Sequence, residues 1–201
     1  MFDLYRTIKA PAKGVYKEKG SKFFAFSYPV SNEASIKEHL AILQKQFHDA
    51  RHYCYAWRLE PEKTHYRVND DGEPSGSAGK PIFGQIVSRD LSDILVVVVR
   101  YFGGTKLGVG GLIQAYRAAA SDALDQSTII ECRVFDILKL EFAYDQMNSV
   151  MKVIKDRQLI IEDQIFDMDC SLILKSWKRK TEEVLATFSK ITRCKITVIE
   201  E

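Results

Sequence analysis

The chain has 201 residues, of which 46% are hydrophobic and 28% are charged. This composition is typical of a globular protein that buries one large core or two smaller ones. The formal net charge of +2 at pH 7 excludes a broadly basic nucleic-acid-binding domain, so any basic surface must be local.

The first part of the chain is predicted to alternate strands and helices. A strand ends at Pro29, Ser31 is a candidate helix cap, and Pro81 is tolerable only in the first turn of a helix. The predicted elements are strands at residues 23–28, 53–59 and 65–68, and helices at residues 31–47 and 78–87.

The next stretch organises the chain. Residues 94–99 are an unbroken, mostly β-branched apolar run, which is typical of a strand covered on both faces. Five glycines follow, and from Leu112 apolar residues recur at helical spacing to about Gln126. The glycines are Gly103, Gly104, Gly108, Gly110 and Gly111. The order β-α-β-β-α-β-α predicts an α+β domain or a small two-layer sandwich.

The pattern restarts after Thr128 and predicts a second domain. The expected order is strand, helix, strand, strand, helix and strand, at residues 135–142, 144–157, 159–166, 168–176, 178–191 and 194–199. This βαββαβ order is that of a ferredoxin-like fold. We therefore expect an N-terminal domain at residues 1–130 and a C-terminal domain at residues 133–201, with an exposed linker around residues 126–133.

The cysteines and the apolar runs indicate the cellular compartment in which we expect the protein. The four cysteines are scattered and lack the spacing of a metal site or a disulfide scaffold, which predicts reduced thiols. No signal peptide is recognised, and the longest apolar run is too short to span a bilayer. We expect a cytoplasmic protein without a membrane partner.

The polar loop at residues 69–81 holds three acids, Asp70, Asp71 and Glu73. Their carboxylates could bind Mg²⁺, because hard cations take oxygen ligands. Alternatively, they could bond nearby backbone N–H groups in turns. A third alternative is direct contact with a substrate or a partner, and an enzyme would use these acids as its catalytic groups.

A zinc interpretation is invited by His48 and His52, which lie four residues apart and could share Asp71 or Cys54 as a further ligand. However, the acid after His48 is Asp where the zinc-protease motif has Glu. The segment also runs from a helix end into a strand, so the two rings need not share a face. We therefore expect no metal and no cofactor, and surface or interface histidines.

The glycine-rich loop has two interpretations. It could aim backbone N–H groups and a helix N-terminus at an anion or an RNA phosphate. It could equally serve turns and tight packing of a helix on a sheet. Its spacing matches neither known nucleotide fingerprint. The predicted binding residues are Ser75, Lys80, Arg100, Tyr101 and Lys106 together with Gly103, Gly104, Gly108, Gly110 and Gly111, in one cleft with the acidic loop.

Two long motifs carry a resemblance to a known family. They are DDGEPSGSAGKP at residues 70–81 and VVVRYFGGTKLGVGGL at residues 97–112, preceded by EKGSKF at 18–23 and HDARHYCYA at 48–56. With these motifs the chain resembles the YigZ/IMPACT family, in its bacterial two-domain type. The resemblance implies a first domain similar to domain 2 of ribosomal protein S5, and a second similar to a ferredoxin-like domain of elongation factor G.

Three functions follow from these patterns and this resemblance. Because eukaryotic members of the family regulate translation initiation, the first is a translation-associated regulator that binds RNA or the ribosome. Lys80, Arg100 and Lys106 would meet phosphates, and Tyr101 or Phe102 would stack on a base. The second is a hydrolase or transferase acting on a phosphorylated or peptide-like small molecule through the three acids. The third is a protein-interaction module without catalysis. No feature is specific to DNA, and we favour the first function.

Overall fold

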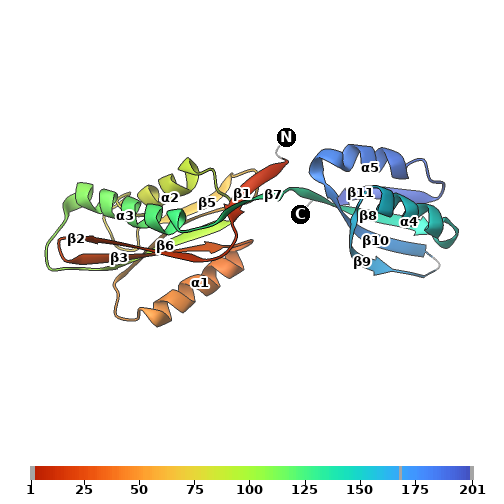
Figure 1. The fold of residues 1–201 in the computed structure, drawn as a ribbon. Helices are drawn as coiled ribbons and strands as arrows, with labels where there is room; N and C mark the ends of the chain where they lie inside the picture. The colour runs from red at the N-terminus through yellow and green to blue at the C-terminus, as the bar shows by residue number, and fades with distance from the viewer. Residues whose placement is uncertain (1–2, 168, 200–201) are drawn as a thin grey trace. The chain divides into compact units, whose positions relative to one another are not determined.

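The computed structural model describes residues 3–167 and 169–199 (Figure 1). The chain divides into two compact units, one formed by Tyr5–Cys132 and the other by the described residues on either side of it. Each unit combines helices with an antiparallel sheet. The predicted α+β class is therefore confirmed.

The unit of Tyr5–Cys132 is built on a five-stranded sheet of order β2-β3-β6-β4-β5. A separate pair, β1 and β7, lies outside this sheet. The elements are β1 Leu4–Ile8, β2 Ala12–Glu18, β3 Ser21–Pro29, α1 Glu33–Gln46, β4 His52–Leu59, β5 His65–Asn69, α2 Gly79–Ser88, β6 Ile94–Tyr101, α3 Gly108–Asp125 and β7 Ile129–Arg133.

The central strand β6 is buried on both faces, as its apolar run predicts. Ile94, Val96 and Val98 belong to a core with residues of α2 and α3. The alternate residues Leu95, Val97 and Val99 belong to a second core with residues of α1. Figure 1 shows α1 on one face of the sheet and α2 with α3 on the other. The unit has three layers, so the two-layer alternative is wrong.

The other unit has the predicted βαββαβ order and a sheet of order β11-β8-β10-β9. Its helices cover a core of buried residues that includes Leu140, Val150 and Phe188. The strand predicted over residues 168–176 begins at Met168, which lies outside the described residues. The elements are β8 Phe135–Ala143, η1 Tyr144–Gln146, α4 Met147–Asp156, β9 Ile160–Ile165, β10 Asp169–Trp177, η2 Lys178–Lys180, α5 Thr181–Phe188 and β11 Cys194–Ile199.

Two local predictions are wrong. The cap of α1 is Asn32 instead of Ser31, because Asn32 Oδ1 accepts the Ser35 N–H at 2.9 Å. Helix α3 begins at Gly108, four residues before Leu112, so three of the five glycines are helical. Within the expected linker at residues 126–133, Ile129–Arg133 form strand β7, which pairs with β1. In the described part of the chain, no helix is long and apolar enough to cross a bilayer.

Candidate functional site

Asp70 organises the motif loop, residues 70–81, which joins β5 to α2. Its carboxylate accepts three backbone hydrogen bonds, from Gly76 N at 2.7 Å, Ala78 N at 2.9 Å and Gly79 N at 2.8 Å. Because Ala78 and Gly79 begin α2, Asp70 caps this helix from a distance along the chain. Burial raises the pKa of Asp70, but the three N–H groups and Lys80 lower it more, so the net pKa is below the usual value.

Asp71 ties the motif loop to the start of β4. Its Oδ2 accepts the Tyr53 N–H at 2.6 Å, and its backbone oxygen lies 2.8 Å from His52 Nδ1. His48 is exposed in the turn after α1. Over residues 3–167 and 169–199, no three His, Cys, Asp or Glu side chains are grouped to hold a metal ion. Of the three candidates, His52 and Asp71 therefore meet in a structural contact through the Asp71 backbone, and His48 takes no part in it.

Glu73 points into the core and pairs with Arg100 of β6. Its Oε1 lies 2.6 Å from Arg100 Nη1, and the two side chains are 4% and 8% exposed. The Tyr116 hydroxyl of α3 donates to the same Oε1 at 2.7 Å, and the Cys54 thiol lies 3.2 Å from that hydroxyl. Burial raises the pKa of Tyr116 and of Cys54 well above their usual values. Both groups are therefore neutral and serve as hydrogen-bonding partners.

Arg100 was expected to contact phosphate, but part of its guanidinium group is paired with Glu73 within the protein. Besides the Glu73 pair, the guanidinium carbon lies 5.4 Å from the centre of the Phe23 ring and 5.7 Å from that of Phe102. Its Nε is buried and has no hydrogen-bond partner in the described structure. Arg100 thus fixes the motif loop on the central strand.

The loop after β6 is shorter than the glycine pattern suggests, because α3 already begins at Gly108. Several of its glycines are required by close packing or by a positive φ. A Cβ on Gly103 would lie 1.9 Å from the Gly20 carbonyl carbon, so the loop can approach the β2–β3 turn only with glycine here. Gly104 and Gly108 both have positive φ, and a Cβ on Gly111 would crowd Leu107. The packing interpretation of the glycines therefore holds for these positions.

Neither packing nor backbone conformation requires a glycine at Gly110 of α3 or at Gly84 of α2. A Cβ at either position would meet nothing within 4 Å, and neither residue has a left-handed backbone. Both residues are exposed within helices. Glycine in an exposed helix costs about 0.5–1 kcal/mol relative to alanine. These two glycines leave bare backbone on the surface without an internal reason for it.

The N-terminus of α3 is open to an anion. Leu107 at the N-cap makes no side-chain capping bond, and the first turn carries no acidic residue. The backbone N–H groups of this turn therefore keep the positive end of the helix dipole uncovered. Lys106 is exposed immediately before it. This end of α3 contrasts with α2, whose N-terminus is occupied by Asp70.

A cavity of about 370 Å³ lies between α2 and α3. Lys80 and Gly84 line it from α2, and Ile113 and Arg117 line it from α3, each pair one helical turn apart. The other described residues of its lining are Gly76, Pro81 and Gln85. No acidic side chain is among these lining residues, so the cavity carries the positive charges of the exposed Lys80 and Arg117.

Arg117 was missed by sequence reasoning. The signal that could have found it is spacing, because Gly110, Ile113 and Arg117 recur at three- and four-residue intervals on one face of a helix. We define the α2–α3 face as Lys80, Gly84, Lys106, Gly110 and Arg117.

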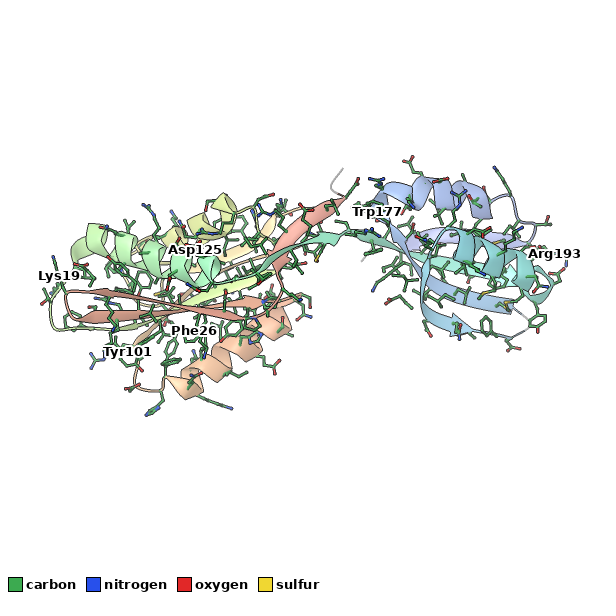
Figure 2. All side chains as sticks on the ribbon, viewed as in Figure 1. Lys19, Phe26, Tyr101, Asp125, Trp177 and Arg193 are labelled. Carbon is green, nitrogen blue, oxygen red and sulfur yellow. The ribbon has the colours of Figure 1, made fainter. Side chains whose placement is uncertain are left out.

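Ser75 and Tyr101 are not among the residues that line the α2–α3 cavity. Ser75 is exposed in the motif loop. Tyr101 lies on the α1 side of the sheet, where Figure 2 labels it. Its hydroxyl donates to Asp49 Oδ1 at 2.5 Å, which lowers the pKa of Asp49 and raises that of Tyr101 to about 12. The candidate residues are thus divided between a motif-loop cluster, the α2–α3 cavity and the α1 side.

Comparison with known proteins places the chain in a family. The model of the Impact N-terminal domain matches residues 19–124. The IMPACT family member YvyE of Bacillus subtilis is 32% identical over 163 residues, which cover 81% of this chain and 75% of the relative. The chain belongs to the IMPACT family. The IMPACT family member YigZ of Escherichia coli is 33% identical over 70% of either chain.

A solved structure supports the fold. The alignment with a crystal structure of a hypothetical protein covers 100% of both chains, with 27% sequence identity and a TM-score of 0.80. The segment matched by the IMPACT model contains the motif loop, β6 and nearly all of α3. Both the buried pair and the α2–α3 face therefore belong to the part of the chain that defines the family.

Proposed function

We propose that this IMPACT-family protein is a translation-associated regulator that binds RNA, free or within the ribosome, across its α2–α3 face. The observation that carries the proposal is the cavity between the two helices, which joins Lys80 and Arg117 without any acidic lining residue. Phosphate is the part of RNA that such a cationic cavity favours. The net charge of +2 means that only a few such contacts are available.

Bare backbone on the same face supports close approach of an RNA strand. Gly84 lines the cavity, and Gly110 lies one turn before Ile113 on α3. A side chain at either position would hold a phosphate away from the helix. The uncovered first turn of α3 offers N–H donors and the positive end of the helix dipole to that phosphate.

The link with translation rests on the family resemblance. The motifs at residues 70–81 and 97–112 resemble those of a family whose eukaryotic members regulate translation initiation. The implied similarity of the two domains to parts of ribosomal protein S5 and elongation factor G points to the same machinery.

The enzyme alternative is less well supported by the geometry. Asp70, Asp71 and Glu73 all bond donors of their own chain, and the lowered pKa of Asp70 makes it a weak base near neutral pH. A protein-interaction module would not need a cavity lined by cations and bare glycine backbone. RNA binding accounts for both features.

The salt dependence of binding tests the proposal. With contacts from Lys80, Lys106 and Arg117 to single-stranded RNA, the slope of log affinity against log salt should be about −2, at roughly 0.7 per contact. Lys80→Ala and Arg117→Ala should each reduce that slope by about 0.7 and weaken all sequences alike. Lys37→Ala on α1, at the opposite face of the sheet, removes the same charge and should leave the slope unchanged. A wild-type chain that binds neither RNA nor ribosomes at ~50 mM salt would contradict the proposal.

A further inference from the structure

Two adjacent cavities lie at the end of the five-stranded sheet where β3 begins, β6 ends and β4 begins. Their volumes are about 470 Å³ and 290 Å³. They share Asp49, Tyr101 and Phe102 as lining residues. Neither uses a residue of the α2–α3 face.

The larger cavity is walled by aromatic rings. Phe24, Phe47, Tyr101 and Phe102 line it together with Gly20, Lys22 and Asp49. The Phe24 and Phe47 rings are 5.9 Å apart and nearly parallel, and Phe24 meets Tyr101 edge to face at 6.0 Å. Phe102 is 57% exposed, which is unusual for so large an apolar ring. Such walls suit a flat aromatic ligand, because a base stacks on aromatic side chains.

The smaller cavity brings two arginines and a histidine together. Arg51, His52 and Arg100 line it, beside Ala50 and the three shared residues. Arg100 is largely buried, and its Nε has no hydrogen-bond partner in the described part of the chain. His52 Nδ1 lies 2.8 Å from the Asp71 carbonyl oxygen, so Nδ1 carries the hydrogen and this bond fixes the orientation of the ring. The two arginines beside this ring supply the planar, forked donors that bind phosphate.

Asp49 stands where the two cavities meet. The Tyr101 hydroxyl holds its carboxylate and lowers the pKa of Asp49, so the group is ionised at neutral pH. An ionised carboxylate accepts hydrogen bonds from ring N–H groups, exocyclic amines or ribose hydroxyls. From the larger cavity to the smaller one, the lining therefore changes from the aromatic rings to the Asp49 carboxylate and then to the two arginines.

We propose that these two cavities form one nucleotide-binding site, with the base against the aromatic rings and the phosphate against Arg51 and Arg100, beside His52. The aromatic rings would stack on the base, the Asp49 carboxylate would accept a hydrogen bond from the sugar or the base, and the two arginines would contact the phosphate. The ligand is a free nucleotide or an unpaired nucleotide of an RNA strand, since both present the same chemistry. Because the site shares no residue with the α2–α3 face, failure of either proposal leaves the other standing.

Calorimetric titration of the full chain with the four nucleoside 5′-monophosphates and the matching nucleosides tests the site. A monophosphate should bind about ten-fold or more tightly than its nucleoside. Arg51→Ala should reduce monophosphate affinity toward that of the nucleoside, because only Arg100 is left to contact the phosphate, and should leave nucleoside affinity unchanged. Phe102→Ala should weaken both ligands. Arg51 and Phe102 are exposed, so both variants should fold. Arg67→Ala, an equal loss of charge at an exposed position on β5, should change neither affinity.

A single-stranded RNA hexamer distinguishes the two sources of the ligand. Binding of monophosphates but not of the hexamer identifies a free nucleotide. Hexamer binding that is weakened by both Arg51→Ala and Phe102→Ala, without monophosphate binding, identifies an unpaired nucleotide of RNA. Binding of neither ligand, or binding that both variants leave unchanged, would overturn the proposal.

Discussion

Arg100 Nη1 lies 2.6 Å from Glu73 Oε1, and both side chains are almost wholly buried. One belongs to the central strand β6 and the other to the motif loop, so the ion pair fixes that loop on the sheet. Removing two charges from water is costly, and the attraction between them offsets this only with further hydrogen bonds. Tyr116 supplies one such bond to Glu73.

Loss of either partner should therefore be more damaging than loss of both. We expect Glu73→Leu to reduce the free energy of unfolding by about 3–5 kcal/mol, because it leaves Arg100 buried and unpaired. The double variant Glu73→Leu, Arg100→Met should recover most of this loss. Urea denaturation of the single and double variants measures both values, and a double variant as unstable as Glu73→Leu would contradict the explanation.

The Asp70 cap predicts a pH-dependent contribution to stability. Asp70→Ala removes the acceptor for three N–H groups at the start of α2 and should cost about 1–2 kcal/mol. Because the folded pKa of Asp70 is lowered, its stabilisation is full above the unfolded pKa of about 4 and declines as pH falls through the folded value. Unfolding measured against pH should show wild type and variant converging in acid. A constant difference between them would contradict this role.

The close approach of two chain segments predicts the effect of Gly103→Ala. Its Cβ would lie 1.9 Å from the Gly20 carbonyl carbon, so the loop must move and the variant should be destabilised. Gly110→Ala is the matched control, since nothing lies within 4 Å of its Cβ. That variant should be stabilised by about 0.5–1 kcal/mol. Thermal unfolding compares the two, and equal melting temperatures would be the contrary result.

Much of the fold could be predicted because it depends on local pattern. The apolar run of β6 and the helical spacing in α1 and α3 specify their own elements. Strand β7 escaped prediction because it depends on pairing with the distant β1. The start of α3 at Gly108 escaped because glycine is a poor helix former.

The site was predicted less completely, because its contacts join residues far apart in sequence. The three acids of the motif loop look alike in sequence, yet Asp70 caps a helix whereas Glu73 enters the core. Arg117 becomes a site residue only because α3 packs beside α2. Phe47 and Asp49 meet Tyr101 only through the placement of the turn after α1.

The two units should unfold separately, since the cores of Tyr5–Cys132 share no residue with the core of the other unit. We propose on this basis that they are independent domains. Leu140→Ala removes a fully buried side chain of the second core and should cost that unit about 2–5 kcal/mol. Differential scanning calorimetry should show one transition lowered and the other unchanged. A single transition that shifts as a whole would contradict independence.

The most direct test of RNA binding on the α2–α3 face is the RNA affinity of the double variant Gly84→Ala, Gly110→Ala. Neither new side chain meets an atom within 4 Å, so the fold should be at least as stable as wild type. We predict that affinity for single-stranded RNA or ribosomes at ~50 mM salt falls by about ten-fold or more, because the added methyl groups hold phosphate away from the helices. Wild-type affinity in this stable variant would contradict the account.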